Sequence, residues 1–244
     1  MIDYRTDIQK KMITWWQSPL GRSVLKQEKN ALQTLSSYFY GNYQFQLGIG
    51  QRLLPEVPLS KMQKIMGRSA DVEGRNELLP FKCHSLDTML LVHVIEFSTD
   101  PHQVLREAER TLVADGTLVI CSFNPWSFWG LRCLFSFKAA PPWHGHFFSQ
   151  TRIKDWLALL NFEVVAIERL AFHPPIQSER WLTRSLMIER VGKRLWPIFS
   201  GVTILVATKR TIPLTPITMY QHVKHLFPNR SLVSQPIARE KNDG

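Results

Sequence analysis

The stretch TMLLVHVIEFSTDPHQVLREAERTLVADGTLVICSF, residues 88–123, decides the fold. It opens with an apolar run at 88–95, as expected for a strand that is covered on both faces. Asp100 suits a helix N-cap and Pro101 suits the first helical position, so a helix follows. Residues 117–123 form a second strand-like run. A strand, a helix and another strand in this order predict a parallel α/β sheet.

Elements of the same kind lie on both sides of this stretch. In residues 1–40, apolar positions at three-to-four spacing are interrupted by SPLG at 18–21, which predicts two helices joined by a turn. The other predicted elements are a strand at 43–49, a helix at 149–162, strands at 162–172 and 201–210, and an amphipathic helix at 178–196. The resulting divisions are a helical cap at 1–42, a domain at 43–210 with a helical insertion at 173–200, and a loosely ordered tail at 211–244.

Several motifs of this domain occur in the order typical of one enzyme family. They are an LPF turn at 79–81, HVIEF at 93–97, DP at 100–101, ADG at 114–116 and GHFFSQTRIKDWLALLNFEV at 145–164. In this order they resemble class I S-adenosylmethionine-dependent methyltransferases. FNPWSFWGLR, PPWHGHF and KRTIPLTP further resemble the YafS-type group of bacterial methyltransferase-domain proteins. The resemblance implies a Rossmann-like, seven-stranded, mostly parallel sheet with helices on both faces, and S-adenosylmethionine as cofactor.

The segment YQFQLGIG, residues 43–50, falls where this family has its cofactor loop. Gly48 and Gly50 allow the backbone to approach the methionyl group closely. The usual acidic residue is replaced by Gln46, which can accept a hydrogen bond but brings no charge. This change could weaken affinity by about 10- to 100-fold. Without its context, a single GxG after a strand is also typical of a tight turn.

Two further positions complete the cofactor site that the resemblance implies. Asp71 follows a short predicted strand and is the carboxylate that could accept the ribose hydroxyls. His93 and Glu96 follow a buried strand, where the family lines the cofactor pocket. As structural residues, they could instead cap that strand and the next helix.

Substrate-binding candidates come from the segment after the next strand. Asn124, at the carboxyl end of that strand, lies where substrates approach parallel sheets, and it is also a turn signal. Trp126 and Trp129 belong to an aromatic segment that could cover the site, dock on a membrane or pack into the core. We expect part of this segment to be exposed, because charged residues interrupt it. The candidates for a catalytic base are His93, His144 and His146.

Composition restricts the possible partners and the setting. The net charge of +10 is consistent with an anionic partner or a membrane surface. It is equally consistent with ordinary charged residues scattered over a solvated surface. No run of five basic residues marks a nucleic-acid motif, no further ligands at metal spacing accompany the histidine pairs, and the longest apolar stretch is too short to cross a bilayer. Three cysteines without a CxxC pair predict free thiols in the cytoplasm.

These observations leave two main functions open. The first is S-adenosylmethionine-dependent methylation of an unidentified acceptor through a degenerate cofactor loop. The second is a catalytically inactive, methyltransferase-like binding or scaffold protein. A peripheral membrane protein that modifies a lipid or quinone is a third possibility, which rests on the aromatic segment and the basic charge.

Overall fold

The computed structural model describes residues 12–57, 60–66, 74–135, 142–176, 192 and 196–211. The chain divides into residues 1–211 and 212–244, and the second unit lies outside the described residues. Within the described residues, no helix is long and apolar enough to cross a membrane.

The described residues form a six-stranded sheet in the order β2-β1-β3-β4-β6-β5. Its strands are β1 (Tyr43–Leu47), β2 (Met62–Met66), β3 (Leu86–Val92), β4 (Leu112–Phe123), β5 (Phe162–Leu170) and β6 (Val202–Lys209). All neighbouring pairs are parallel except those of β6, which runs antiparallel to β4 and β5. The sequence predicts seven strands, and the described part of the chain contains six.

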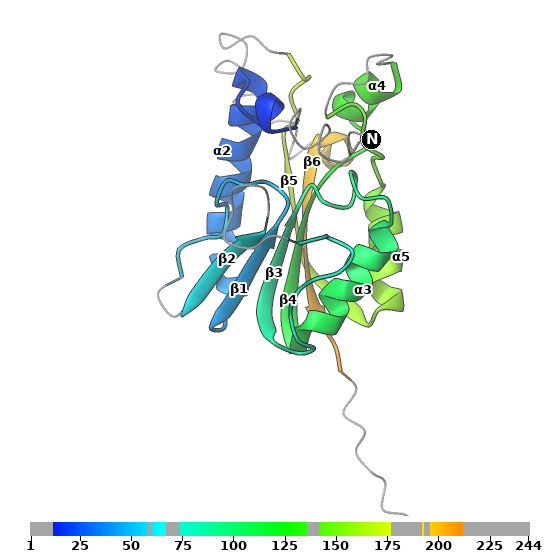
Figure 1. Cartoon of the computed structure of the whole chain (residues 1–244). Coiled ribbons are helices and arrows are strands. Elements are labelled where there is room, and N and C mark those ends of the chain that lie inside the picture. The colour runs from blue at the N-terminus through cyan, green and yellow to red at the C-terminus, as the bar shows by residue number, and fades with distance from the viewer. Residues whose placement is uncertain are drawn as a thin grey trace, which may run out of the picture. The chain divides into compact units, whose positions relative to one another are not determined.

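Helices cover both faces of this sheet (Figure 1). The helix α2 (Pro19–Thr34) lies on one face, and α3 (Pro101–Thr111) and α5 (Gln150–Leu159) lie on the other. Alternate residues of β3 therefore enter two separate cores: Leu90 packs on the α2 side, and Met89 and Leu91 pack on the α3 side. This burial on both faces explains why the strand has no polar alternation.

The ends of the helices follow from local sequence. Ser18 caps α2 by accepting a hydrogen bond from the Gly21 backbone N–H at 3.1 Å, which confirms the predicted helix break. Asp100 caps α3 in the same way through the Gln103 backbone N–H. Asn161 takes a left-handed conformation after α5, with a φ of 59°. The predicted helix at 178–196 lies almost wholly outside the described residues.

Short elements complete the fold beyond the ends of the strands. They are a helical turn at 12–16, η1 (Ser36–Tyr38), α4 (Phe128–Phe135) and η2 (Pro197–Phe199). The first of these packs against α4, because the ring centroids of Trp15 and Trp129 lie 6.3 Å apart. The helical turn at 12–16 and α4 therefore meet beyond the ends of the strands, where several predicted site residues lie.

Candidate functional site

Three predicted site residues lie at the same edge of the sheet. Gly48, His93 and Asn124 directly follow β1, β3 and β4. These strands are parallel and in register, and the His93 backbone N–H donates to the Cys121 carbonyl at 3.0 Å. Ligands of open α/β sheets bind at the carboxyl ends of such strands. The topology therefore brings the glycine loop and the two downstream candidates together.

The glycine loop is tightly held and partly open. Gly48 has a φ of 111°, and a Cβ there would collide with the Val92 carbonyl oxygen. Close packing of β1 on the end of β3 is therefore a sufficient reason for this glycine. Gly48 and Gly50 are exposed while Ile49 between them is buried. The loop thus presents bare backbone to solvent, as approach of a cofactor requires.

Gln46 is fully buried and organises the chain that follows the loop. Its Nε2 donates to the carbonyls of Ile49 at 3.0 Å and Gln51 at 2.7 Å. Its Oε1 accepts from the backbone N–H groups of Leu53 at 2.9 Å and Leu54 at 3.3 Å. A glutamine amide has two donor hydrogens and two acceptor lone pairs. All four are used inside the protein, so Gln46 keeps no group for a ligand in this arrangement.

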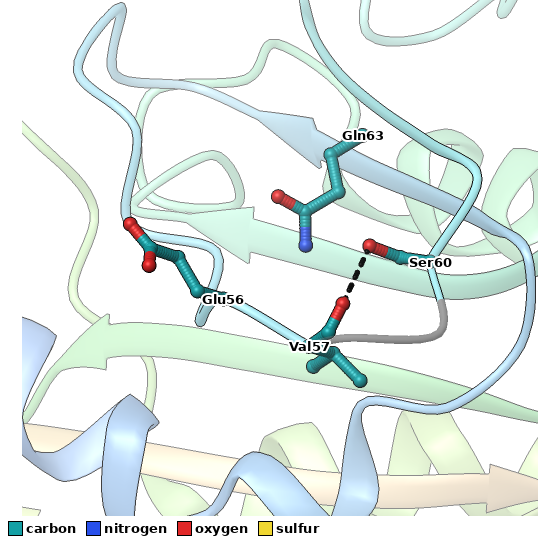
Figure 2. Close-up of a pocket in the computed structure, with 4 residues that line it drawn as sticks. All are labelled: Glu56, Val57, Ser60 and Gln63. Atoms are coloured by element: carbon teal, nitrogen blue, oxygen red, sulfur yellow. Dashed lines mark hydrogen bonds between the residues drawn. The ribbon is translucent and has the colours of Figure 1, made fainter.

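The connection from β1 to β2 is irregular. Residues 51–57 and 60–61, its described part, contain no helix. Arg52, two residues after Gly50, donates to the side chain of Gln63 in β2 at 3.3 Å. A depression of about 430 Å³ lies beside it, and Figure 2 shows the Ser60 hydroxyl directed at the Val57 carbonyl across it. Among the residues that the structure describes, no predicted site residue lines this depression.

The strongest polar cluster of the described residues surrounds His93. Its Nε2 lies 2.7 Å from Glu28 Oε1 and its Nδ1 lies 3.1 Å from Glu96 Oε1. Glu96 Oε1 also accepts from the Phe123 backbone N–H at 2.7 Å. All three side chains are buried. The cluster therefore joins α2 to the segment that follows β3 and to the last residue of β4.

The charge of His93 follows from these contacts. Burial lowers its pKa, but attraction to Glu28 and hydrogen bonds to Glu28 and Glu96 outweigh burial, and the pKa is raised to about 9. At neutral pH both ring nitrogens are therefore protonated and donate to carboxylates. In this arrangement His93 cannot accept a proton, so its predicted role as a base requires that it first lose one.

Several buried polar atoms beside His93 lack partners. Within the described part of the chain, Glu28 Oε2, Glu96 Oε2 and Trp15 Nε1 are buried and make no hydrogen bond. Two acidic side chains face one histidine, so the cluster holds more acidic groups than basic ones. Such groups are costly to bury unless a ligand, an ion or water satisfies them.

Aromatic rings enclose this cluster. The His93 ring stacks on Phe123 at 4.1 Å between centroids and lies 5.3 Å from Trp16. Phe147 stacks on the Phe123 ring as well. Rings from the N-terminal segment, β4 and the segment after α4 thus keep the histidine and both carboxylates away from bulk water.

The substrate-binding candidates separate into surface and core. Trp126 is 66% exposed, whereas Trp129, expected beside it on an exposed segment, is fully buried. Trp129 Nε1 donates to the His173 carbonyl at 3.0 Å, and its ring meets Trp15 and Phe123. The reason is helical geometry: the two tryptophans are three residues apart across the start of α4, and only the later one faces inward.

The remaining candidates have mixed surroundings. Asn124 Nδ2 donates to the Ile198 carbonyl at 2.6 Å, and its Oδ1 accepts from the Trp126 backbone N–H, so Asn124 holds a turn. His144 and His146 are exposed, and the His146 backbone N–H donates to the Glu96 carbonyl at 2.9 Å. Asp71 lies outside the described residues. No group of three potential metal ligands occurs in the described ranges.

Sequence reasoning missed Glu28. It lies on the apolar stripe of α2, with Val24, Leu25 and Leu32 at helical spacing around it, and all of them are buried. A carboxylate on such a stripe is rarely buried without a partner. That position was therefore a usable signal, although it did not identify His93 as the partner.

Comparisons with known proteins agree with this arrangement. The methyltransferase domain family matches residues 56–120. The uncharacterized protein YafS of Escherichia coli (strain K12) is 34% identical over 215 residues, which are 85% of each chain.

Two solved structures share the fold. A SAM-dependent methyltransferase from Thermotoga maritima, described as a possible histamine N-methyltransferase, has a TM-score of 0.60 at 21% identity, over 81% of this chain and 93% of its own. A chain from the complex of a Haloferax volcanii methyltransferase activator with a methyltransferase has a TM-score of 0.55 at 14% identity, over 84% and 98%. The protein belongs to the class I S-adenosylmethionine-dependent methyltransferase family, in the same group as YafS.

Proposed function

We propose that the protein transfers a methyl group from S-adenosylmethionine to an acceptor that is not identified. The observation that carries this proposal is the buried cluster of Glu28, His93 and Glu96 at the strand ends, with one carboxylate oxygen of each glutamate unpartnered. Gly48 contacts Val92, the residue that precedes His93. The glycine loop and the cluster are therefore immediate neighbours.

The residues present fit the charges of the cofactor. S-adenosylmethionine carries an ammonium and a sulfonium, and both cations favour nearby carboxylates. Gln46 brings no charge and its amide is already used. In our proposal Glu28 and Glu96 supply the missing negative charge, and Gly48 and Gly50 provide backbone for close approach.

The chain's own residues would then perform three tasks. When bound, S-adenosylmethionine supplies the methyl group. Trp16, Phe123 and Phe147 keep water away from the charged cluster, and this strengthens each electrostatic contact there. His93, as an imidazolium, holds the two carboxylates in place. His144 and His146 remain the predicted candidates for a base, and Asp71 remains the predicted ribose contact.

A specific observation favours the alternative of an inactive binding or scaffold protein. The amide of Gln46 is saturated by the loop itself, and the described part of the β1–β2 connection contains no helix. Both features leave fewer groups for a cofactor than the family normally has.

Unfolding followed by heat or denaturant, with and without S-adenosylmethionine, separates the two functions. Ligand at 100 times its dissociation constant should stabilise the protein by about 2.7 kcal/mol. Gly50→Val should abolish this effect and leave the free protein folded, because Gly50 is exposed and has no positive φ. Gly48→Val is a poorer test, since its side chain would collide with Val92.

The charge assignment has its own matched pair of variants. Glu28→Gln should weaken S-adenosylmethionine binding by about tenfold, because it removes one charge from the cluster. Glu109→Gln removes a charge from α3 on the other face of the sheet, where Glu109 pairs with Lys209, and should leave binding unchanged. A well-folded protein without any shift at millimolar ligand would support the scaffold function instead.

A further inference from the structure

An unusual amount of apolar surface is exposed beyond the strand ends. We call it the apolar patch, and it comprises Trp126, Phe128, Leu131, Leu134 and Phe135 together with Trp196, Ile198 and Phe199, each at least half exposed. Single exposed apolar side chains are ordinary, but a concentration of this size marks an interaction surface.

The two parts of the patch are joined. Asn124, which precedes the first part, donates from Nδ2 to the carbonyl of Ile198 at 2.6 Å. Its backbone N–H donates to the Gly201 carbonyl at 3.0 Å, just after the second part. The patch therefore belongs to one surface, although its two parts lie about sixty positions apart in the sequence.

The patch also rests on a firm support. Phe128, Leu131, Leu134 and Phe135 follow helical spacing along the outer side of α4. The inner side of the same helix is fixed by the buried Trp129, whose Nε1 donates to the His173 carbonyl. The buried Trp129 therefore fixes α4, and α4 in turn positions the apolar side chains on its outer side.

The sequence on either side of the patch is mainly basic. Residues 124–149 contain Arg132 and Lys138 and no acidic residue, and the sequence between Ile176 and Trp196 contains five basic and two acidic residues. Arg132 is exposed, donates to the Pro175 carbonyl at 2.9 Å and lies over the Trp143 ring. Pro175 and Trp196 border that basic segment, so both of its ends lie beside α4 or within the patch.

Exposed apolar side chains beside Arg132, on a chain with a net charge of +10, match the surface of an anionic bilayer. Aromatic and aliphatic groups enter the boundary between headgroups and acyl chains, while basic groups attract the acidic headgroups. A second copy of this chain would bring like charges together, so it fits less well. We propose that the apolar patch docks the protein on anionic lipid membranes. This inference does not depend on methyl transfer.

Vesicle co-sedimentation of the full chain tests the proposal. The wild-type protein should sediment with phosphatidylcholine vesicles that contain about 30% phosphatidylglycerol, and clearly less with phosphatidylcholine alone. Binding should fall when salt is raised from about 0.1 M to about 0.5 M, because salt screens the attraction of basic groups to the surface.

Two leucines provide a matched comparison. Leu134 on α4 is 77% exposed, and Leu159 at the far end of α5 is 81% exposed. The double change Leu134→Ser with Phe135→Ser should lower partitioning onto anionic vesicles at least about tenfold, because two large apolar groups no longer leave water. Leu159→Ser should have no effect, because β5 starts just after it and it therefore lies at the opposite end of the strands from the patch. Both variants should fold, since the altered side chains are exposed.

Three results would overturn the proposal. They are absence of sedimentation with anionic vesicles at low salt, equal losses from the α4 and α5 changes, and equal binding to neutral and anionic vesicles. A dimer in solution that the α4 double change dissolves, without vesicle binding, would assign the patch to a second copy of the chain instead. Each of these results leaves the cofactor experiments above unaffected.

Discussion

The two halves of the sheet bury their strands in different ways. Around β3 and β4, a strand–helix–strand unit is complete, and most side chains in the strands have less than 1% exposure. Around β1 and β2, the described part of the connection has no helix, and β2 is exposed at its start. The half that provides the glycine loop is therefore the one with less packing.

Hydrogen bonds of side-chain amides replace helix packing in the β1–β2 half. Gln46 fixes four backbone groups of the loop, and Gln63 donates to the Gln44 side chain and to the Pro55 carbonyl, both at 2.9 Å. Amide groups can hold a short irregular segment because they satisfy its backbone where no helix does. Stability in one half should thus depend on apolar volume and in the other on a few polar contacts.

The largest expected effect tests the apolar half. Leu91→Ala in β3 should lower the free energy of unfolding by about 2–5 kcal/mol, because it leaves a cavity among fully buried neighbours. Urea denaturation measures this change as a shift of the midpoint, provided that the slope of the free energy against urea concentration is the same in both proteins.

The matched change in the other half is Met62→Ala in β2. Met62 is 43% exposed, so its loss should alter the free energy of unfolding by less than about 0.5 kcal/mol. Equal losses from Leu91→Ala and Met62→Ala would contradict the proposed difference between the halves.

The second prediction concerns the junction between the helical cap and the β3–β4 half. The folded pKa of His93, about 9, lies above the ordinary value of 6.5, so folding binds a proton. This stabilisation is fully present below pH 6.5 and is lost as pH rises through 9. Between pH 6 and pH 8 the protein should lose about 2 kcal/mol of stability from this group alone.

Glu28→Gln provides the control for that pH dependence. It removes the main attraction for the imidazolium, so the decrease between pH 6 and pH 8 should become smaller. Burial also raises the pKa of the Cys121 thiol. The stability that this thiol contributes is therefore lost above pH 8, in the same direction as that of His93. A variant with the wild-type pH profile would show that the pair with Glu28 does not set the charge of His93.

Much of the β3–β4 half was predictable from local signals. The structure confirms three features that have local causes. They are the Asp100-Pro101 helix cap, the burial of β3 on both faces and the left-handed conformation of Asn161. The start of β4 was placed five residues too late, at 117, because Asp115 and Gly116 looked like the end of a turn. Residues 113–116 pair with neither β3 nor β6, because the register with β3 shifts between Leu86 and Thr88, and so this part of the strand can carry turn-like composition.

The candidate site was less predictable, because its contacts connect distant segments. Glu28 and His93 are 65 positions apart, and no pattern in either segment names the other. Packing into the core was one of the alternatives for the aromatic segment, while its charged residues favoured partial exposure; Trp129 is buried and Trp126 is exposed. Arg132 in fact faces outward from the same helix that buries Trp129.

The last prediction restores the acidic residue that the family usually has. In Gln46→Glu, the carboxylate can still accept hydrogen bonds from Leu53 and Leu54, but it can no longer donate to the carbonyls of Ile49 and Gln51. Those carbonyls would then face a buried negative charge without a donor, at a cost of about 1–3 kcal/mol. We therefore expect Gln46→Glu to be less stable than the wild type in urea and no tighter in S-adenosylmethionine binding by calorimetry. A more stable or tighter-binding variant would mean that the loop is not built around the amide, and the β1–β2 half would then be an ordinary cofactor loop with one altered residue.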